Sequence, residues 1–216
     1  MSVAVKICGL SQPHMVEAAL AAGAAYIGLV FYGPSPRNVT IEQAEKLASL
    51  ARGRATIVAL TVNAPDALLR DIARRVSPDF IQAHGEETPD RVREISALTG
   101  IPVIKAVKVR QAGDVERARD YAGAAAMVLF DAEAPATLAG ALPGGNGVAF
   151  DWTLLDKADY GRPFMLSGGL DCYNITEAIR ITGAPIVDVS SGVERAPGLK
   201  DARLIGKFIE AARSAR

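Results

Sequence analysis

Short apolar runs rich in β-branched residues alternate with alanine-rich segments from one end of the chain to the other. The runs have the length of strands, and the segments between them are amphipathic in the manner of helices. Eight runs are predicted to be strands, at residues 3–8, 25–31, 55–62, 80–84, 103–107, 126–131, 164–168 and 186–190.

The segments between these runs carry the end signals of helices. Strands that alternate with helices form a parallel sheet through right-handed crossovers, and eight of them favour a (β/α)8 TIM barrel, with residues 1–216 as a single domain. The alternative is an open doubly wound sheet, whose GxGxxG fingerprint should follow the first strand and does not. The helix signals are first-turn prolines, N-cap threonines and stop glycines, namely Pro13, Pro65, Thr40, Thr88, Gly23, Gly100 and Gly183.

Two successive predicted strands end in small residues. Residues 164–170 read FMLSGGL, and residues 188–194 read DVSSGVE. Backbone N–H groups in a glycine turn that opens a helix bind anions. As the last two turns of a barrel, they predict one phosphate site. Taken singly, each turn also fits an ordinary strand-to-helix connection in which glycine and serine supply geometry alone.

Polar side chains recur on one face of the predicted strands. Lys6 and Cys8 share a face opposite Val5 and Ile7, because side chains alternate along a strand. We expect this polar face to line a narrow lumen. The first and last strands of a closed barrel are neighbours, so Lys6 and Asp188 should approach each other, since an unpaired buried charge is costly. The further residues assigned to this face are Gln82, His84, Lys105, Asp131 and Ser190.

Composition narrows the class of partner. Lys plus Arg and Asp plus Glu each number 24, so the chain has no basic surface for nucleic acid and no polybasic membrane patch. It shows no signal-peptide pattern and no apolar run near the roughly 20 residues of a membrane span. We therefore expect a cytoplasmic protein with a small-molecule partner, in which Cys8 and Cys172 are free thiols.

Functional groups of parallel barrels lie at the carboxyl ends of the strands. A thiol and a carboxyl group across a phosphate-anchored substrate suit proton transfer from carbon and to a departing oxygen. The nearby cation of Lys6 favours a thiolate at Cys8. The candidates at this end are Cys8, Arg37, His84, Asp131, Asp188, Ser190 and Ser191.

Each candidate also has a purely structural interpretation. A lone cysteine that ends a strand is typical of a small buried hydrophobe. Asp131 can cap the next segment, Asp188 can serve only as an ion-pair partner, and Arg37 can be a solvated loop residue. The two histidines, His14 and His84, lack metal-ligand spacing, and no GxxxxGK loop is present, so we expect no metal, cofactor or bound nucleotide.

Six short motifs occur along the chain in this order: KICGL at 6–10, FYGPSPR at 31–37, QAHGEE at 82–87, FDW at 150–152, LSGGL at 166–170 and DVSSGVE at 188–194. With these motifs the chain resembles the phosphoribosylanthranilate isomerase family of tryptophan biosynthesis, over residues 5 to about 208. The resemblance implies an Amadori rearrangement of N-(5-phosphoribosyl)anthranilate to 1-(2-carboxyphenylamino)-1-deoxy-D-ribulose 5-phosphate, a phosphosugar reaction.

The resemblance also implies roles for individual residues. Cys8 matches the family's general base, Asp131 its general acid, and Arg37 the residue that holds the anthranilate carboxylate. In these roles the acid must keep its proton near neutral pH and the thiol must lose its own. Further substrate contacts are expected from Gln82, His84 and Asp188, and phosphate contacts from Gly145, Gly147, Gly168, Gly169, Ser190, Ser191 and Gly192.

Two positions depart from the family pattern. Ala83 replaces the leucine of a QLHG motif, which affects packing alone, and Asn146 stands where the family usually has Thr or Ser. Residues 132–147, rich in Ala, Gly and Pro, are expected to be the most flexible stretch. Cys172 receives no role, and a monomer or a homodimer is expected.

Two other functions remain open from the sequence. One is another phosphate-binding barrel enzyme, such as the histidine-pathway isomerase of the same reaction type. That enzyme resembles two tandem half-barrels with an aspartate base, whereas this chain has Cys8 and no evident half repeat. The other is a non-catalytic barrel that binds a phosphosugar and regulates a partner, which predicts binding without turnover.

Overall fold

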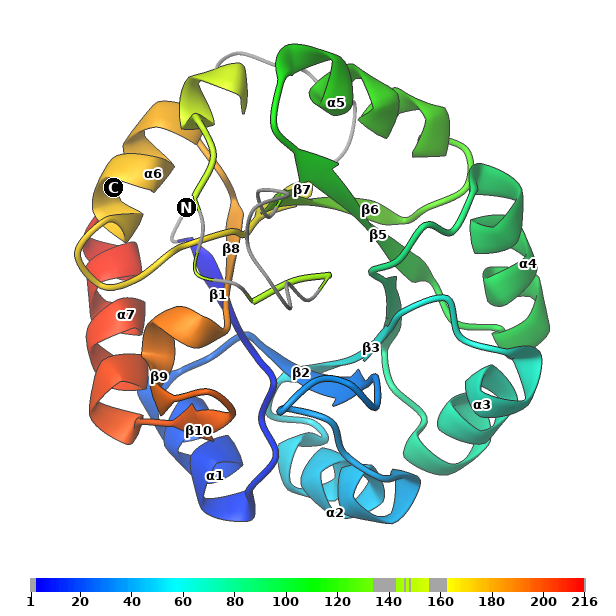
Figure 1. Ribbon diagram of the computed structural model, residues 1–216. Helices are drawn as coiled ribbons and strands as arrows, with labels where there is room; N and C mark the ends of the chain where they lie inside the picture. The colour runs from blue at the N-terminus through cyan, green and yellow to red at the C-terminus, as the bar shows by residue number, and fades with distance from the viewer. Residues whose placement is uncertain (1–2, 134–142, 146, 148, 156–162, 216) are drawn as a thin grey trace.

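Eight parallel strands close into a barrel in chain order, and β1 pairs with both β2 and β8. The computed structural model describes residues 3–133, 143–145, 147, 149–155 and 163–215. Helices surround the barrel (Figure 1), which confirms the predicted (β/α)8 TIM barrel and excludes the open sheet. The strands are β1 (Ala4–Cys8), β2 (Tyr26–Phe31), β3 (Thr56–Thr61), β4 (Phe80–Ala83), β5 (Val103–Val109), β6 (Met127–Ala132), β7 (Phe164–Leu166) and β8 (Ile186–Val189).

All the predicted strands occur, with ends that differ by one or two residues. The differences matter most at the carboxyl ends, because His84, Gly168 and Ser190 lie just beyond β4, β7 and β8 instead of inside them. The His84 N–H still donates to the Thr61 carbonyl at 2.9 Å, so the chain leaves the sheet gradually. These residues therefore belong to the loops that build the rim.

The predicted helix signals lie at the observed helix ends. Thr40 and Gln43 form a reciprocal capping box at the start of α2, and Thr88 caps α4. The three predicted stop glycines follow α1, α4 and α6 in the left-handed conformation. The helical elements are α1 (Pro13–Ala22), α2 (Ile41–Ala51), α3 (Asp66–Asp71), the π-helical η1 (Ile72–Val76), α4 (Pro89–Thr99), α5 (Ala112–Glu116), η2 (Arg117–Tyr121), η3 (Trp152–Leu155), α6 (Ile175–Thr182), η4 (Ser191–Val193) and α7 (Ala202–Ser214).

The barrel interior has an apolar layer beneath a polar one. Ile186, Leu129 and their neighbours from other strands pack together in the lower layer. Two residues further along the same strands, Asp188 and Asp131 occupy the same face nearer the carboxyl ends. The Lys6 ammonium, in a side chain with 0% exposure, lies 2.9 Å from Asp188 Oδ1, as predicted. The parity argument therefore holds for the first and last strands.

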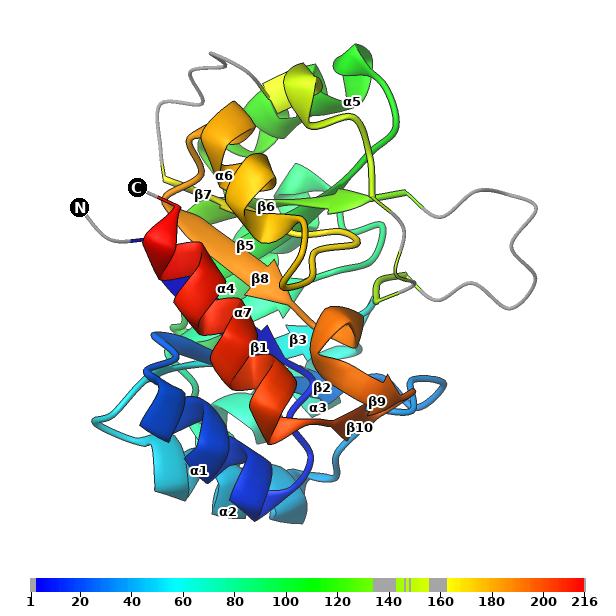
Figure 2. The ribbon, with the colours of Figure 1, turned by 90° about the vertical axis from the view of Figure 1, so that its left-hand side faces the viewer.

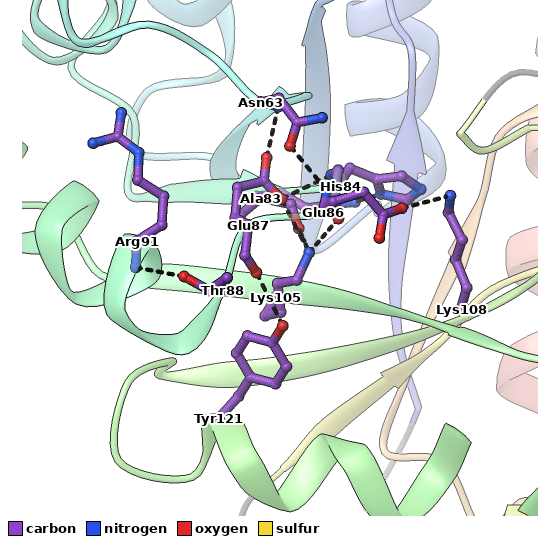
Figure 3. Close-up of polar contacts among 12 residues, drawn as sticks. Asn63, Ala83, His84, Glu86, Glu87, Thr88, Arg91, Lys105, Lys108 and Tyr121 are labelled. Carbon is purple, nitrogen blue, oxygen red and sulfur yellow. Dashed lines mark hydrogen bonds and ion pairs between the residues drawn. The ribbon is translucent and has the colours of Figure 1, made fainter. Parts of the chain in front are cut away.

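Lys105 lies on the opposite face from the one predicted. Ile104 and Ala106, which alternate with it along β5, face the lumen, so Lys105 points outward toward the helices. Its ammonium lies 3.0 Å from Glu87 Oε2 and 5.8 Å from the centre of the Tyr121 ring (Figure 3). The expectation is wrong because a buried carboxylate of the β4–α4 loop gives this lysine a partner outside the barrel.

A small antiparallel hairpin after β8 is absent from the sequence prediction. It pairs β9 (Glu194–Ala196) with β10 (Leu199–Lys200) and leads into α7, which packs over β1 (Figure 2). Strands of three and two residues are too short to show a periodic pattern. The hairpin nevertheless places two charged side chains at the rim, as described below.

Most of the stretch expected to be flexible, 132–147, falls on residues 134–142 and 146, which lie outside the described residues together with the Asn146 departure. In the part of the chain that the structure describes, no helix has the length and apolar character needed to cross a membrane.

Replacing Asp188 by Ala should lower the free energy of unfolding by about 3–5 kcal/mol, because it leaves the fully buried Lys6 ammonium without its carboxylate. Urea denaturation followed by circular dichroism measures the loss. The double variant Lys6→Met, Asp188→Leu should recover most of it, since it removes both charges. Equal losses in the single and double variants would show that the ion pair is not what stabilises this seam.

Candidate active site

A cavity opens at the carboxyl ends of the strands. The space within its lining is about 740 Å³, open solvent at its mouth included. Among the predicted site residues, Gln82, Gly147 and Gly192 do not line it. The ones that do are Cys8, Arg37, His84, Asp131, Gly145, Gly168, Gly169, Asp188, Ser190 and Ser191.

Cys8 ends β1 and is 4% exposed in the cavity wall. Gly28 on β2 keeps room beside it, because a Cβ at that position would lie 2.9 Å from the Cys8 sulfur. Burial raises the pKa of the Cys8 thiol and Asp188 adds to the shift, while Lys6 and Lys200 lower it only in part. Lys6 therefore acts in the expected direction, toward the thiolate, but the effect of burial is larger and the net shift of the Cys8 pKa is upward.

The pKa of Lys6 is also raised, but for a different reason. Burial would lower the pKa of Lys6, but the nearby charges of Asp188 and Cys8 outweigh burial and raise it. Lys6 therefore stays protonated, and its positive charge is available to stabilise a thiolate at Cys8 when one forms.

Asp131 and His84 form a buried pair in the cavity wall. His84 Nε2 lies 3.1 Å from Asp131 Oδ2, and the two residues are 5% and 3% exposed. Gln82 Nε2 lies 2.7 Å from the other ring nitrogen, His84 Nδ1. Gln82 is itself fully buried behind His84. Gly144 passes over the pair so closely that a Cβ there would lie 2.5 Å from His84 Nε2.

The loop between β4 and α4 is fixed from outside the barrel (Figure 3). The Glu87 carboxylate accepts hydrogen bonds from the backbone N–H groups of Asn63 and Gly85, at 2.7 and 2.8 Å, and from Lys105. The Tyr121 hydroxyl donates to the Glu87 carbonyl at 2.9 Å. Burial lowers the pKa of Lys105, and the charge of Glu87 opposes that shift only in part. These contacts hold the loop that begins at the buried histidine.

Arg37 is 5% exposed in the β2–α2 loop, and one edge of its guanidinium is already engaged. Its Nε and Nη2 atoms donate to the two carboxylate oxygens of Glu194 at 2.8 and 2.9 Å, a bidentate geometry. Nη2 also donates to the Gly145 carbonyl at 3.4 Å. Gly9 packs against the stem of the arginine, since a Cβ there would lie 2.6 Å from Arg37 Cδ. Nη1 makes no hydrogen bond to any described residue, and Gly145 lies beside it, since a Cβ there would lie 2.7 Å from Nη1.

Glu194 and Lys200, on β9 and β10, were missed as candidates by the sequence analysis. Lys200 Nζ donates to Glu194 Oε1 at 2.7 Å and to the Ser190 carbonyl at 2.9 Å. Burial lowers the pKa of Lys200. Burial alone would raise the pKa of Glu194, but the hydrogen bond from Arg37 and the charge of Lys200 outweigh it and lower that pKa. The position of Glu194 at the end of the DVSSGVE motif is the signal that could have identified it, and Lys200 has no such signal.

The two predicted phosphate turns lie against each other. Gly168 and Gly169 have φ angles of 91° and 61°, in the left-handed region that favours glycine. Gly192 approaches the other turn so closely that a Cβ would lie 1.9 Å from the Leu170 carbonyl oxygen. The turn after β8 opens the short helix η4, whereas residues 171–174 separate the turn after β7 from α6. The expectation that both turns open helices directly therefore holds for the second alone.

The remaining predicted residues are placed less centrally. Gly145 lines the cavity beside Arg37, and the nearest atom to a Cβ built on Gly147 is Ser191 Oγ at 3.9 Å. Cys172 is half-buried and is not among the lining residues. Within the described ranges, no group of three or more His, Cys, Asp or Glu side chains is arranged to hold a metal ion.

Replacing Gly192 by Ala should lower the free energy of unfolding by about 1–3 kcal/mol and weaken binding of inorganic phosphate, because the added Cβ forces the two turns apart. Chemical denaturation and calorimetric titration measure the two effects. The matched control is Gly206→Ala in α7, where nothing lies within 4 Å of the new Cβ. That variant should gain roughly 0.5–1 kcal/mol from helix propensity. Similar behaviour of both variants would contradict the close-contact explanation.

Known proteins resemble this chain in sequence and in fold. Residues 5–211 match the family model described as N-(5'phosphoribosyl)anthranilate (PRA) isomerase. The N-(5'-phosphoribosyl)anthranilate isomerase of Rhizobium meliloti (strain 1021) is 50% identical over 215 residues, which cover 100% of this chain and 99% of that protein. The crystal structure of phosphoribosyl anthranilate isomerase from Thermotoga maritima is 36% identical with a TM-score of 0.87, and the match covers 98% of this chain and 99% of that one.

A second solved structure is informative because of its ligand. It is a phosphoribosyl anthranilate isomerase in complex with reduced 1-(o-carboxyphenylamino)-1-deoxyribulose 5-phosphate, 35% identical to this chain with a TM-score of 0.85, and the match covers 98% of this chain and 99% of that one. The resemblance indicated by the rim motifs is thus confirmed, and the chain belongs to the N-(5'-phosphoribosyl)anthranilate isomerase family.

Proposed function

We propose that the chain catalyses the Amadori rearrangement of N-(5-phosphoribosyl)anthranilate, with Cys8 as general base and Asp131 as general acid. The observation that carries this proposal is that a buried thiol and a buried carboxyl group line one cavity whose rim also holds the two glycine turns. Membership of the isomerase family supports the same reaction. The proposal needs no cofactor, because proton transfers alone convert the aldose derivative to the ketose.

The substrate carries two anionic groups, a phosphate and a carboxylate. We propose that its phosphate lies against the turns at Gly168 and Ser191, where small residues line the cavity and backbone N–H groups could bind an anion. Its anthranilate carboxylate would lie at Nη1 of Arg37, whose other edge is held by Glu194. The solved relative binds a ligand that likewise carries a carboxyl group on a phenyl ring and a sugar phosphate, which supports a substrate of this class.

The proposed reaction has two proton-transfer steps. Asp131 donates its proton to the furanose ring oxygen, the bond from C1 to that oxygen breaks, and the nitrogen lone pair forms an iminium. Cys8, as thiolate, then takes the proton from C2. The C–H bonding electrons form a C1–C2 double bond, and the iminium electrons return to nitrogen. The resulting enamine tautomerises to the C2 ketone.

Replacing Cys8 by Ala or Asp131 by Asn should each lower kcat by roughly 10²–10⁴-fold, the usual contribution of a general acid or base. The assay follows the loss of fluorescence of freshly generated N-(5-phosphoribosyl)anthranilate, and circular dichroism checks the fold. The matched control is Cys172→Ser, a thiol outside the cavity lining, which should keep near-normal turnover. Near-normal kcat in either the Cys8 or the Asp131 variant would refute the proposed pair.

The same assay separates the other two functions. A different sugar-phosphate isomerase would leave N-(5-phosphoribosyl)anthranilate unconverted at catalytic protein concentrations. A regulatory barrel would bind the phosphosugar, detected by calorimetric titration, and would show no turnover with it.

The pH dependence of the Asp131→Asn variant reports on the base, because that variant has no titrating acid. Since the pKa of Cys8 is raised, the thiol keeps its proton to higher pH, and the reactive thiolate is the minor form at pH 7. Below that pKa, the residual kcat/KM of the variant should increase roughly tenfold per pH unit, in proportion to the thiolate. Steady-state assays between pH 6 and pH 9, with thermal melts at each pH as the control, measure this. A flat profile of the variant over that range would contradict Cys8 as the base.

A further inference from the structure

Three buried polar side chains form a line, two of them in the cavity wall and the third behind it. Gln82 Nε2 lies 2.7 Å from His84 Nδ1, and His84 Nε2 lies 3.1 Å from Asp131 Oδ2. Gln82 is 0% exposed and is not among the residues that line the cavity, so it contacts a ligand only through His84. A residue in this place can influence the reaction only by changing the state of its neighbours.

The amide fixes where the proton of the imidazole lies. An amide nitrogen donates hydrogen bonds and accepts none, so His84 Nδ1 must accept through its lone pair. With the Gln82 amide nitrogen beside Nδ1, a neutral ring carries its proton on Nε2, and that N–H donates to Asp131 Oδ2. Each ring nitrogen is thereby committed to one partner.

We propose that Gln82 is a positioning residue that holds His84 in the neutral Nε2–H tautomer and so keeps Asp131 able to donate a proton. This inference rests on the proposed role of Asp131 as the general acid. In this tautomer Asp131 Oδ2 accepts a hydrogen bond from His84, and Oδ1 remains to carry the transferable proton. An imidazolium at His84 would instead pair with Asp131 as a carboxylate, which has no proton to give.

The opposite amide orientation would have the opposite effect. Gln82 Oε1 has no hydrogen-bond partner among the described residues. If it replaced Nε2 beside His84, it would accept from an Nδ1–H, and Nε2 would become an acceptor that draws the Asp131 proton toward the histidine. The orientation present in the structure is the one that leaves the acid's proton for the substrate.

The test replaces Gln82 by Glu, whose carboxylate can only accept from the ring. His84 should then be protonated on both nitrogens at pH 7, and kcat should fall by roughly tenfold or more while KM changes little. Gln82→Met, similar in size without polar atoms, should give a mixture of tautomers and an intermediate loss. The matched control is Gln12→Glu, the same change at an exposed position, which should leave kcat unchanged.

The direct readout is ¹⁵N NMR of histidine-labelled protein. The chain has two histidines, His14 and His84, so the exposed His14 serves as the internal reference and a His14→Asn variant assigns the signals. In the unsubstituted protein, the His84 signals should show a protonated Nε2 and an unprotonated Nδ1. A protonated Nδ1 in that protein would overturn the inference, even if no Gln82 variant folds.

The two proposals fail in distinguishable ways. Full activity of Asp131→Asn would refute the acid role and, with it, the purpose assigned to the tautomer. An inactive Asp131→Asn beside a Gln82→Glu variant with an imidazolium and normal kcat would refute only the inference about Gln82. A lowered kcat in Gln82→Glu with the ring still neutral would likewise overturn it, because the effect would then be structural.

Discussion

The ion pair between Lys6 and Asp188 joins the first and last strands of the barrel, and the geometry of the site depends on it. β1 and β8 are far apart in the chain, and their pairing closes the sheet. Both charged groups are buried at the seam, with Lys6 fully buried and Asp188 at the cavity wall. Closure of the barrel therefore places a fixed cation two residues from the proposed base and a fixed carboxylate two residues from the turn after β8.

Burial governs the chemistry of the groups around that seam. It raises the pKa of the Cys8 thiol against the combined attraction of Lys6 and Lys200. It also lowers the pKa of Lys200, which remains tied to Glu194. The same enclosure that strengthens each charge interaction also makes the thiolate harder to form. The Cys8 thiolate in this setting has a higher proton affinity. A smaller fraction of Cys8 is therefore in the thiolate form at neutral pH.

The barrel and most of its rim were predictable from the sequence because the information is local. Strand and helix patterns, caps and the alternation of side chains within each strand depend on residues close together along the chain. The approach of Lys6 to Asp188 then follows from closure of the barrel, which makes β1 and β8 neighbours. The misassignments have the opposite character. Lys105 on β5 pairs with Glu87 of the β4–α4 loop, a contact between two separate elements. Lys200 is placed at the rim by a hairpin whose strands are too short to show a periodic pattern. The direction of the Cys8 shift depends on burial, which a list of neighbouring charges does not reveal.

The Arg37–Glu194–Lys200 cluster has a consequence for selectivity. Two cations share one carboxylate there, so the buried cluster carries one excess positive charge. A ligand that brings a single carboxylate makes this region neutral, whereas an uncharged aromatic amine leaves the excess uncompensated, and a dianion overshoots it. If the substrate's carboxylate binds at Arg37 as proposed, the short hairpin that carries Glu194 and Lys200 sets the charge which that carboxylate balances.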